Sequence, residues 1–262
     1  TESRGLGDVY KRQPPGDSTE TDTVDTDPSF QAPGPMPTLR SEVSENASTI
    51  DAVSMVVYRP TIQGSFPVVV LMDGFNLAGD LYESYGDHLA SWGFVVVIVD
   101  VVNNVVQSKT HVQLRDAFMS VIDWMTVSNT SNNPIFAGSA DLDMIVAAGH
   151  SAGGKAAVFA ALDDPRVGGL FAIDPVDATP DFAFGGVDAT SYPSLTPERM
   201  GDLSVPSVFI GETTNATGSF GFLPACAPAD DNFQAYYEAV ASAPVLEIDM
   251  LGADHFSFID DP

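Results

Sequence analysis

The sequence predicts a doubly wound α/β fold, with a mostly parallel sheet covered by helices on both faces. Three observations lead to this prediction. Strand-sized apolar runs lack the polar alternation of a half-solvated sheet. Segments with apolar residues at every third or fourth position separate several of these runs. The length of 262 residues and the hydrophobic content of 44% suit one large domain.

The first predicted strand is Ala52–Tyr58, which ends at the turn sequence RPTIQGSFP. The next strand, Val68–Met72, is a continuous apolar run. Helical spacing follows in Asp80–Trp92, and Gly93 ends that helix. The apolar run Phe94–Asp100 then predicts a third strand.

Apolar residues repeating at three or four predict a second helix at Gln113–Val127. Met144–Ala148 is the next strand, and the alanine-rich segment Gly154–Leu162 is a helix. The remaining elements follow the same criteria and are, in order, strand Gly168–Ile173, strand Val205–Ile210, helix Asp231–Ala241 and strand Val245–Met250.

Residues 14–38 are rich in Pro, Asp, Thr and Ser and poor in branched apolar side chains. Such a composition buries too little surface to fold. Residues 1–37 are therefore predicted to be a disordered acidic tether, and residues 38–262 the catalytic domain. The opening sequence TESRGLGDVYKRQ reads as a cloning or sequencing remnant and lacks the apolar core of a signal peptide.

Acidic residues dominate the charge: 36 Asp and Glu against 10 Lys and Arg give a formal charge of −26. The first 40 residues hold seven of the acids and four of the bases, which leaves a net charge of −23 on the other 222. This charge disfavours nucleic acid and anionic membranes as partners. It suits a secreted or extracytoplasmic protein, and we expect a monomer.

Two further classes are excluded by composition. No apolar run approaches the roughly 20 residues of a membrane span. A single cysteine, Cys226, excludes an internal disulfide and a cysteine-based zinc site, and we expect it to be a buried free thiol.

The sequence GHSAGG at 149–154 places Ser151 between glycines, where a buried strand gives way to a helix. This G-x-S-x-G spacing is typical of a sharp elbow that exposes a nucleophilic serine beside a helix N-terminus. A purely structural turn is the alternative. A nucleophilic serine needs a base, and the usual order at such an elbow is serine, acid, histidine.

Of the four histidines, only His255 follows the serine, so His255 is the predicted base. His88 and His111 are expected on the surface, and His150 is expected to pack or hydrogen-bond locally. We favour Asp174 as the acid because it ends the apolar run GLFAID at its carboxyl end. Glu212, after the next strand, and Asp177, three residues beyond Asp174, remain alternatives.

The oxyanion formed during attack requires two donors. One is predicted to be the backbone N–H of Ala152, directly after the nucleophile. The other is predicted in the loop MDGFNLAGD, where Gly74 permits a turn and the N–H of Phe75 is our candidate. The Phe75 ring would then line the acyl pocket; ordinary core packing is the alternative.

At this point five segments in the same order resemble the chlorophyllase family of the α/β-hydrolase superfamily and, beyond it, cutinase-like polyester hydrolases. The resemblance runs from about Val57 to Asp261. The five segments are RPTIQGSFPVVVLMDGFN, GHSAGGKAAVFAAL, AIDPVDAT, LPACAPADDNFQAYYE and DHFSFIDD.

The resemblance implies an α/β-hydrolase fold and an esterase with Ser151, Asp174 and His255 as its catalytic triad, without cofactor or metal. Two positions depart from the family: Asp73 replaces a histidine before the oxyanion glycine, and Ala152 replaces the arginine of plant chlorophyllases. The chain also stops seven residues after His255, where the fold normally adds a helix, which suggests a truncated C-terminus.

We therefore expect a serine carboxylic-ester hydrolase that acts through an acyl-enzyme on esters with a bulky apolar part. Aromatic residues in the loops favour such substrates, with Phe75 and Phe256 as binding residues, although an aromatic cluster can equally be core. These aromatic residues are Phe75, Tyr82, Phe182, Phe184, Phe220, Phe222 and Phe256. Alternatives are a cutinase-like polyester hydrolase, a small-acyl esterase or lipase, and a non-catalytic binding module.

Overall fold

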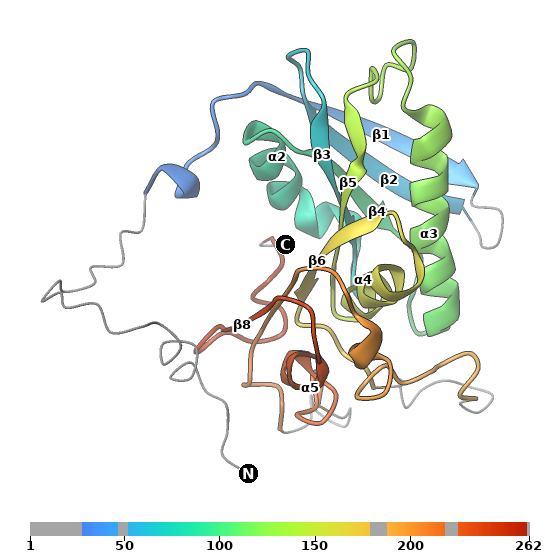
Figure 1. Cartoon of the computed structure of the whole chain (residues 1–262), viewed down its shortest axis with the longest axis vertical. Coiled ribbons are helices and arrows are strands. Elements are labelled where there is room, and N and C mark those ends of the chain that lie inside the picture. The colour runs from blue at the N-terminus through green and yellow to red at the C-terminus, as the bar shows by residue number, and fades with distance from the viewer. Residues whose placement is uncertain (1–27, 47–51, 179–187, 218–224, 261–262) are drawn as a thin grey trace, which may run out of the picture. The chain divides into compact units, whose positions relative to one another are not determined.

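The computed structural model describes residues 28–46, 52–178, 188–217 and 225–260 (Figure 1). The chain divides into two compact units, Thr1–Ala32 and Pro33–Pro262. The described part of the first unit is a short 3₁₀ helix, Pro28–Gln31 (η1). All other described elements belong to the second unit.

Eight strands form one sheet in the order β1-β2-β4-β3-β5-β6-β7-β8 (Figure 1). β1 and β2 are antiparallel to each other, β2 is antiparallel to β4, and the remaining neighbours are parallel. Their bounds are β1 Thr38–Asn46, β2 Ala52–Pro60, β3 Phe66–Met72, β4 Val95–Asp100, β5 Ala140–His150, β6 Val167–Ile173, β7 Ser207–Gly211 and β8 Val245–Asp249.

Helices cover both faces of this sheet. The side chains of α3, α4 and α5 share one buried cluster with one set of alternate strand residues, and those of η2 and α2 share a second cluster with the other set. Figure 1 accordingly shows α2 and α3 on opposite sides of the strands. The helices are η2 Gly79–Tyr82, α2 Glu83–Ser91, α3 His111–Ser128, α4 Ala152–Asp163, η3 Met200–Asp202 and α5 Phe233–Ala239.

The predicted fold class is confirmed: the sheet is mostly parallel, its central strands are buried, and the arrangement is that of an α/β-hydrolase. Val95–Val99 of β4 have no exposed surface, as expected for a strand covered on both faces. None of the helices that the structure describes combines the length and the hydropathy needed to cross a bilayer.

Two strands differ from the prediction because their sequences are polar where they leave the core. β1, with sequence TLRSEVSEN, was not predicted; it pairs only with β2 at the edge of the sheet and so carries charged residues. β5 begins at Ala140, four residues before the apolar run that predicted it. A search for apolar runs finds buried strands and misses such edges.

Candidate active site

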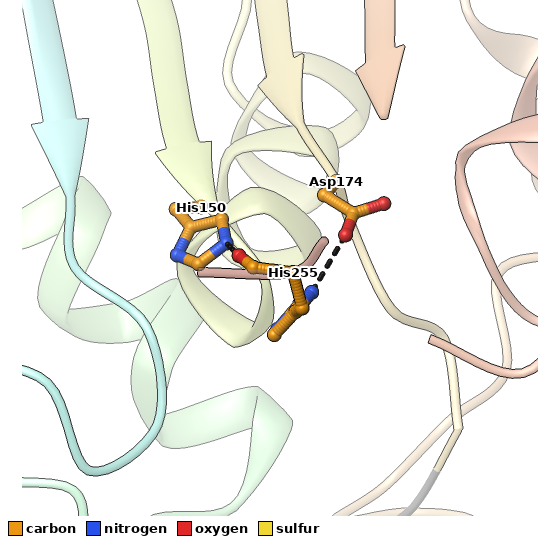
Figure 2. A group of neighbouring side chains, drawn as sticks. All are labelled: His150, Asp174 and His255. Atoms are coloured by element: carbon orange, nitrogen blue, oxygen red, sulfur yellow. Dashed lines mark hydrogen bonds and ion pairs between the residues drawn. The ribbon is translucent and has the colours of Figure 1, made fainter. Parts of the chain in front are cut away.

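Three residues of the candidate site follow strands β5, β6 and β8 at the carboxyl edge of the sheet. Ser151 directly follows β5, and Asp174 directly follows β6. His255 lies in the loop after β8 and reaches back toward both. Figure 2 shows Asp174 at the end of its strand with His255 beside it. The crevice at the carboxyl ends of the strands is the usual place for a ligand site in such a sheet.

Ser151 occupies a strained backbone position between β5 and α4. Its φ of 57° and ψ of −119° lie outside the regions that L-residues ordinarily adopt. The neighbouring glycines make this turn possible: a Cβ on Gly149 would lie 2.3 Å from the Gly153 carbonyl oxygen. A Cβ on Gly153 would lie 2.2 Å from the carbonyl oxygen of Asp73. The turn therefore holds Ser151 against the loop that follows β3.

The His255 side chain bridges the other two residues. Its Nε2 lies 2.9 Å from Ser151 Oγ, and its Nδ1 lies 2.6 Å from Asp174 Oδ2. With Nδ1–H donating to the carboxylate, Nε2 presents its lone pair to the serine hydroxyl. The structure thus brings together, by hydrogen bonds, the three residues predicted from chain order.

Asp174 is fully buried and is also held through its backbone. Its φ is 41°, and its N–H donates to the carbonyl of Ile210 at 2.6 Å. The N–H of Glu212 approaches Asp174 Oδ1 at 3.4 Å. The carboxylate therefore sits between the ends of β6 and β7 and points toward His255 (Figure 2).

The two alternative acids make other contacts. Glu212 is buried at the end of β7, where Oε2 accepts the N–H of Asn215 at 2.8 Å; burial raises the pKa of Glu212. Asp177 pairs with the buried Lys155 of α4 at 2.6 Å. Burial by itself raises the pKa of Asp177, but the charge of Lys155 and several hydrogen bonds lower it to about 2.

The predicted oxyanion loop packs against the elbow. A Cβ on Gly74 would lie 3.3 Å from Ser151 Cβ and 3.2 Å from His150 Nδ1. Phe75 follows and is half-buried, while Ala152, also half-buried, is the first residue of α4. Burial, together with the neighbouring Asp100, raises the pKa of Asp73 well above its usual range.

The aromatic residues expected around the site are only partly described. Phe256 is 42% exposed, and its ring lies edge-on to the His255 ring at 5.6 Å. The interpretation of Tyr82 as a loop aromatic was wrong, because Tyr82 is fully buried behind the elbow. The remaining loop aromatics lie outside the described residues: Phe182, Phe184, Phe220 and Phe222.

The expected environments of His111 and Cys226 were also wrong in part. His111 is buried rather than on the surface; burial, and then the nearby Lys155, lower its pKa to about 3. His150 is packed and hydrogen-bonded beside the nucleophile, as expected, but its partners Tyr82 and His255 lie far along the chain. Cys226 is half-buried, not buried. Chain position alone could not reveal these environments.

A metal could use the closely spaced donor atoms of His150, Asp174 and His255, which lie within 4.8 Å of one another. Hydrogen bonds already engage both ring nitrogens of each histidine. This donor set therefore fits a hydrogen-bonded array better than a set of free metal ligands.

The roles of two residues of the site were not predicted. Lys155 on α4 holds the loop after Asp174 through Asp177, and Asn215 accepts the backbone N–H of His255 at 2.9 Å. The lysine in GHSAGGK was visible as part of the elbow motif, but its partner was not. Nothing in the sequence distinguishes Asn215 from an ordinary loop residue.

Comparison with known proteins gives a consistent result. The chlorophyllase family model matches residues 26–262. Chlorophyllase-1 of Arabidopsis thaliana is 28% identical over 256 residues, covering 94% of this chain and 75% of that protein. Chlorophyllase-2 of the same plant is 25% identical over 226 residues, covering 83% and 68%.

Citrus unshiu has a similar protein, Chlorophyllase-1, chloroplastic, which is 26% identical over 220 residues. This match covers 84% of the chain but only 64% of the relative. The resemblance to chlorophyllases read from the five sequence segments is thus confirmed by a family match that includes all of the described residues. The chain belongs to the chlorophyllase family and is an ester hydrolase of the α/β-hydrolase type.

Proposed function

We propose that this protein is a serine carboxylic-ester hydrolase that works through an acyl-enzyme, with Ser151 as nucleophile, His255 as base and Asp174 as the orienting acid. One observation carries the proposal. The two hydrogen bonds of the His255 ring, 2.9 Å to Ser151 Oγ and 2.6 Å to Asp174 Oδ2, form the relay that this chemistry requires.

In the proposed reaction, Ser151 Oγ attacks the ester carbonyl carbon while His255 Nε2 accepts the hydroxyl proton. His255 then gives that proton to the leaving alcohol. Water attacks the resulting acyl-enzyme by the same proton path and releases the acid. Asp174 holds the ring in one tautomer and stabilises the imidazolium that forms twice in each cycle.

The oxyanion would accept hydrogen bonds from the backbone N–H groups of Ala152 and Phe75. The position of Ala152 as the first residue of α4 supports this assignment, since a helix N-terminus favours negative charge. The close packing of Gly74 on Ser151 supports the role of the loop that carries Phe75.

For the substrate, we propose esters with a bulky apolar part, as the name chlorophyllase implies for the relatives. The exposed Phe256 beside His255 and the half-buried Phe75 are the proposed contacts for that part. A cutinase-like polyester hydrolase or a small-acyl esterase or lipase remains the second candidate. Hydrolysis rates on chlorophyll, a polyester film and a short p-nitrophenyl ester distinguish the three.

The catalytic proposal is tested with a fluorophosphonate probe and intact mass measurement. We expect one adduct on Ser151 in the wild-type protein and none in Ser151→Ala, with turnover lowered roughly 10⁶-fold by the substitution. Ser204→Ala, at an exposed position after η3, is the matched control and should label normally. A folded wild-type protein that takes no adduct would favour the non-catalytic binding module.

We further propose that residues 38–262 are the catalytic unit, that the protein acts as a monomer without a nucleic-acid partner, and that it is extracytoplasmic. The net charge of −23 beyond the first 40 residues supports the absence of a nucleic-acid partner and the extracytoplasmic location. Light scattering of the purified protein tests the oligomeric state, and turnover of a protein beginning at residue 38 tests the catalytic unit.

A further inference from the structure

The backbone of His255 is held by side chains on both of its peptide groups. Its N–H donates to Asn215 Oδ1 at 2.9 Å, and its carbonyl oxygen lies 2.9 Å from His150 Nε2. Figure 2 shows the second of these contacts, with the His150 ring beside the His255 main chain. The two partners come from different elements, one after β7 and one at the end of β5.

The contact on the carbonyl side has a defined direction. A carbonyl oxygen only accepts, so His150 Nε2 must carry the hydrogen. Tyr82 Oη, which lies 2.8 Å from His150 Nδ1, then donates to that nitrogen. Both side chains are fully buried, and burial lowers the pKa of His150 well below its usual value, so the ring stays neutral.

The contact on the amide side is part of a wider connection between two loops. Glu212 Oε2 accepts the N–H of Asn215 at 2.8 Å, which orients the asparagine. Thr214 Oγ1 donates to the carbonyl of Ala253 at 2.6 Å, and Met250 N–H donates to the carbonyl of Gly211 at 2.8 Å. The segment after β7 therefore grips the segment that presents His255.

We propose that His150 and Asn215 are positioning residues, which fix the catalytic histidine through its main chain from opposite sides. This inference rests on the proposed function. The need for such a clamp follows from the reaction: once Ser151 is acylated, its hydroxyl can no longer donate to His255. The ring then keeps only its bond to Asp174, and its place depends on the main chain. Loss of the clamp should therefore slow deacylation more than acylation.

The test uses paired substitutions and a p-nitrophenyl ester in stopped flow. His150→Leu removes the donor, whereas His150→Gln keeps an N–H for His255 and an oxygen for Tyr82. Asn215→Ala removes the acceptor, whereas Asn215→Asp keeps one. We expect the Leu and Ala variants to lose roughly 10- to 100-fold in kcat, the cost of a misplacement of about 1 Å. Because kcat/KM reports acylation, it should stay within about threefold while KM falls with kcat, and a product burst should appear as deacylation becomes limiting.

His150→Gln and Asn215→Asp should recover most of kcat. Their melting temperatures should match those of His150→Leu and Asn215→Ala, so that stability does not explain the recovery. Equal losses within each pair, in step with the melting temperatures, would show a merely structural role and overturn the inference. If His150→Leu does not fold, the half-buried Asn215 pair decides alone. If Asn215→Ala keeps the kcat and the deacylation rate of the wild-type protein, the clamp is overturned. If the wild-type protein itself shows neither turnover nor labelling of Ser151, the proposed function is overturned instead.

Discussion

The elbow that carries Ser151 and the loop that carries His255 reach the same site by different physical means. Residues 149–154 are held by close backbone contacts, within the elbow at Gly149 and with the end of β3 at Gly153, which any Cβ would block. The loop after β8 has little regular structure and depends on side chains from distant elements, such as Asn215 and His150. A substitution at the elbow should therefore be poorly tolerated. In the His255 loop, by contrast, the loss of one hydrogen bond should reduce activity only in part.

The largest effect tests whether the two regions are joined through Asp174. Asp174→Asn should lower turnover roughly 10⁴-fold, because the amide favours the wrong histidine tautomer. Glu212→Gln, at the end of the next strand, is the matched control and should lose less than about tenfold. Steady-state kinetics on one ester measures both. The reverse order would assign the acid to Glu212.

A smaller effect tests the claim that close backbone contacts hold the elbow, here its contact with the end of β3. A Cβ on Gly153 would lie 2.2 Å from the carbonyl oxygen of Asp73 and 2.4 Å from that of Met72, both backbone atoms that cannot yield cheaply. Gly153→Ala should therefore cost roughly 1–3 kcal/mol of stability and about 100-fold in activity. Gly201→Ala, where a Cβ meets nothing within 4 Å, should change neither. Denaturant titration and kinetics decide, and an active Gly153→Ala would contradict the steric account.

The next effect concerns His111, the buried first residue of α3, which lies near Lys155 of α4. Because burial, and then Lys155, lower the pKa of His111 from 6.5 to about 3, the folded state binds fewer protons than the unfolded state between these values. Stability present above pH 6.5 is therefore lost as pH falls toward 3.

By pH 5 this loss should reach about 2 kcal/mol. Urea unfolding at pH 7 and pH 5 should show wild type losing about that much more than His111→Gln. Parallel pH dependences of the two proteins would place His111 in a more polar environment than its burial indicates.

The smallest effect tests whether the His255 loop depends on any one surface contact. Thr214→Val removes the bond from Oγ1 to the Ala253 carbonyl at an exposed position. We expect a stability change of about 0.5 kcal/mol and less than a threefold change in kcat. A tenfold loss in kcat would mean that this single contact, rather than the combined set, holds the loop.

The same contrast explains what the sequence alone could predict. The elbow and the buried strands were visible because their signals are local: glycine spacing at 149–154, and uninterrupted apolar runs such as Val95–Val99. Asp174 and His255 were found by chain order and strand ends, and the structure brings both to Ser151.

Features that depend on distant partners were missed. The edge strand β1 is defined by its pairing with β2 rather than by its own composition. The environments of His111 and His150 arise from neighbours such as Tyr192 and Tyr82, which are 81 and 68 positions away along the chain. Residue type and position carry no record of such contacts until the chain has folded.

The two regions should also form at different times during folding. The elbow closes within six residues, together with the β5–α4 unit that packs into the main core. His255 instead meets Asp174, Ser151 and His150 across 81, 104 and 105 residues of chain. Contacts so far apart in sequence carry a large closure entropy and tend to form late. During refolding, tryptophan fluorescence should therefore recover before esterase activity, because Ser151 would be packed in a nearly complete core before His255 reaches it.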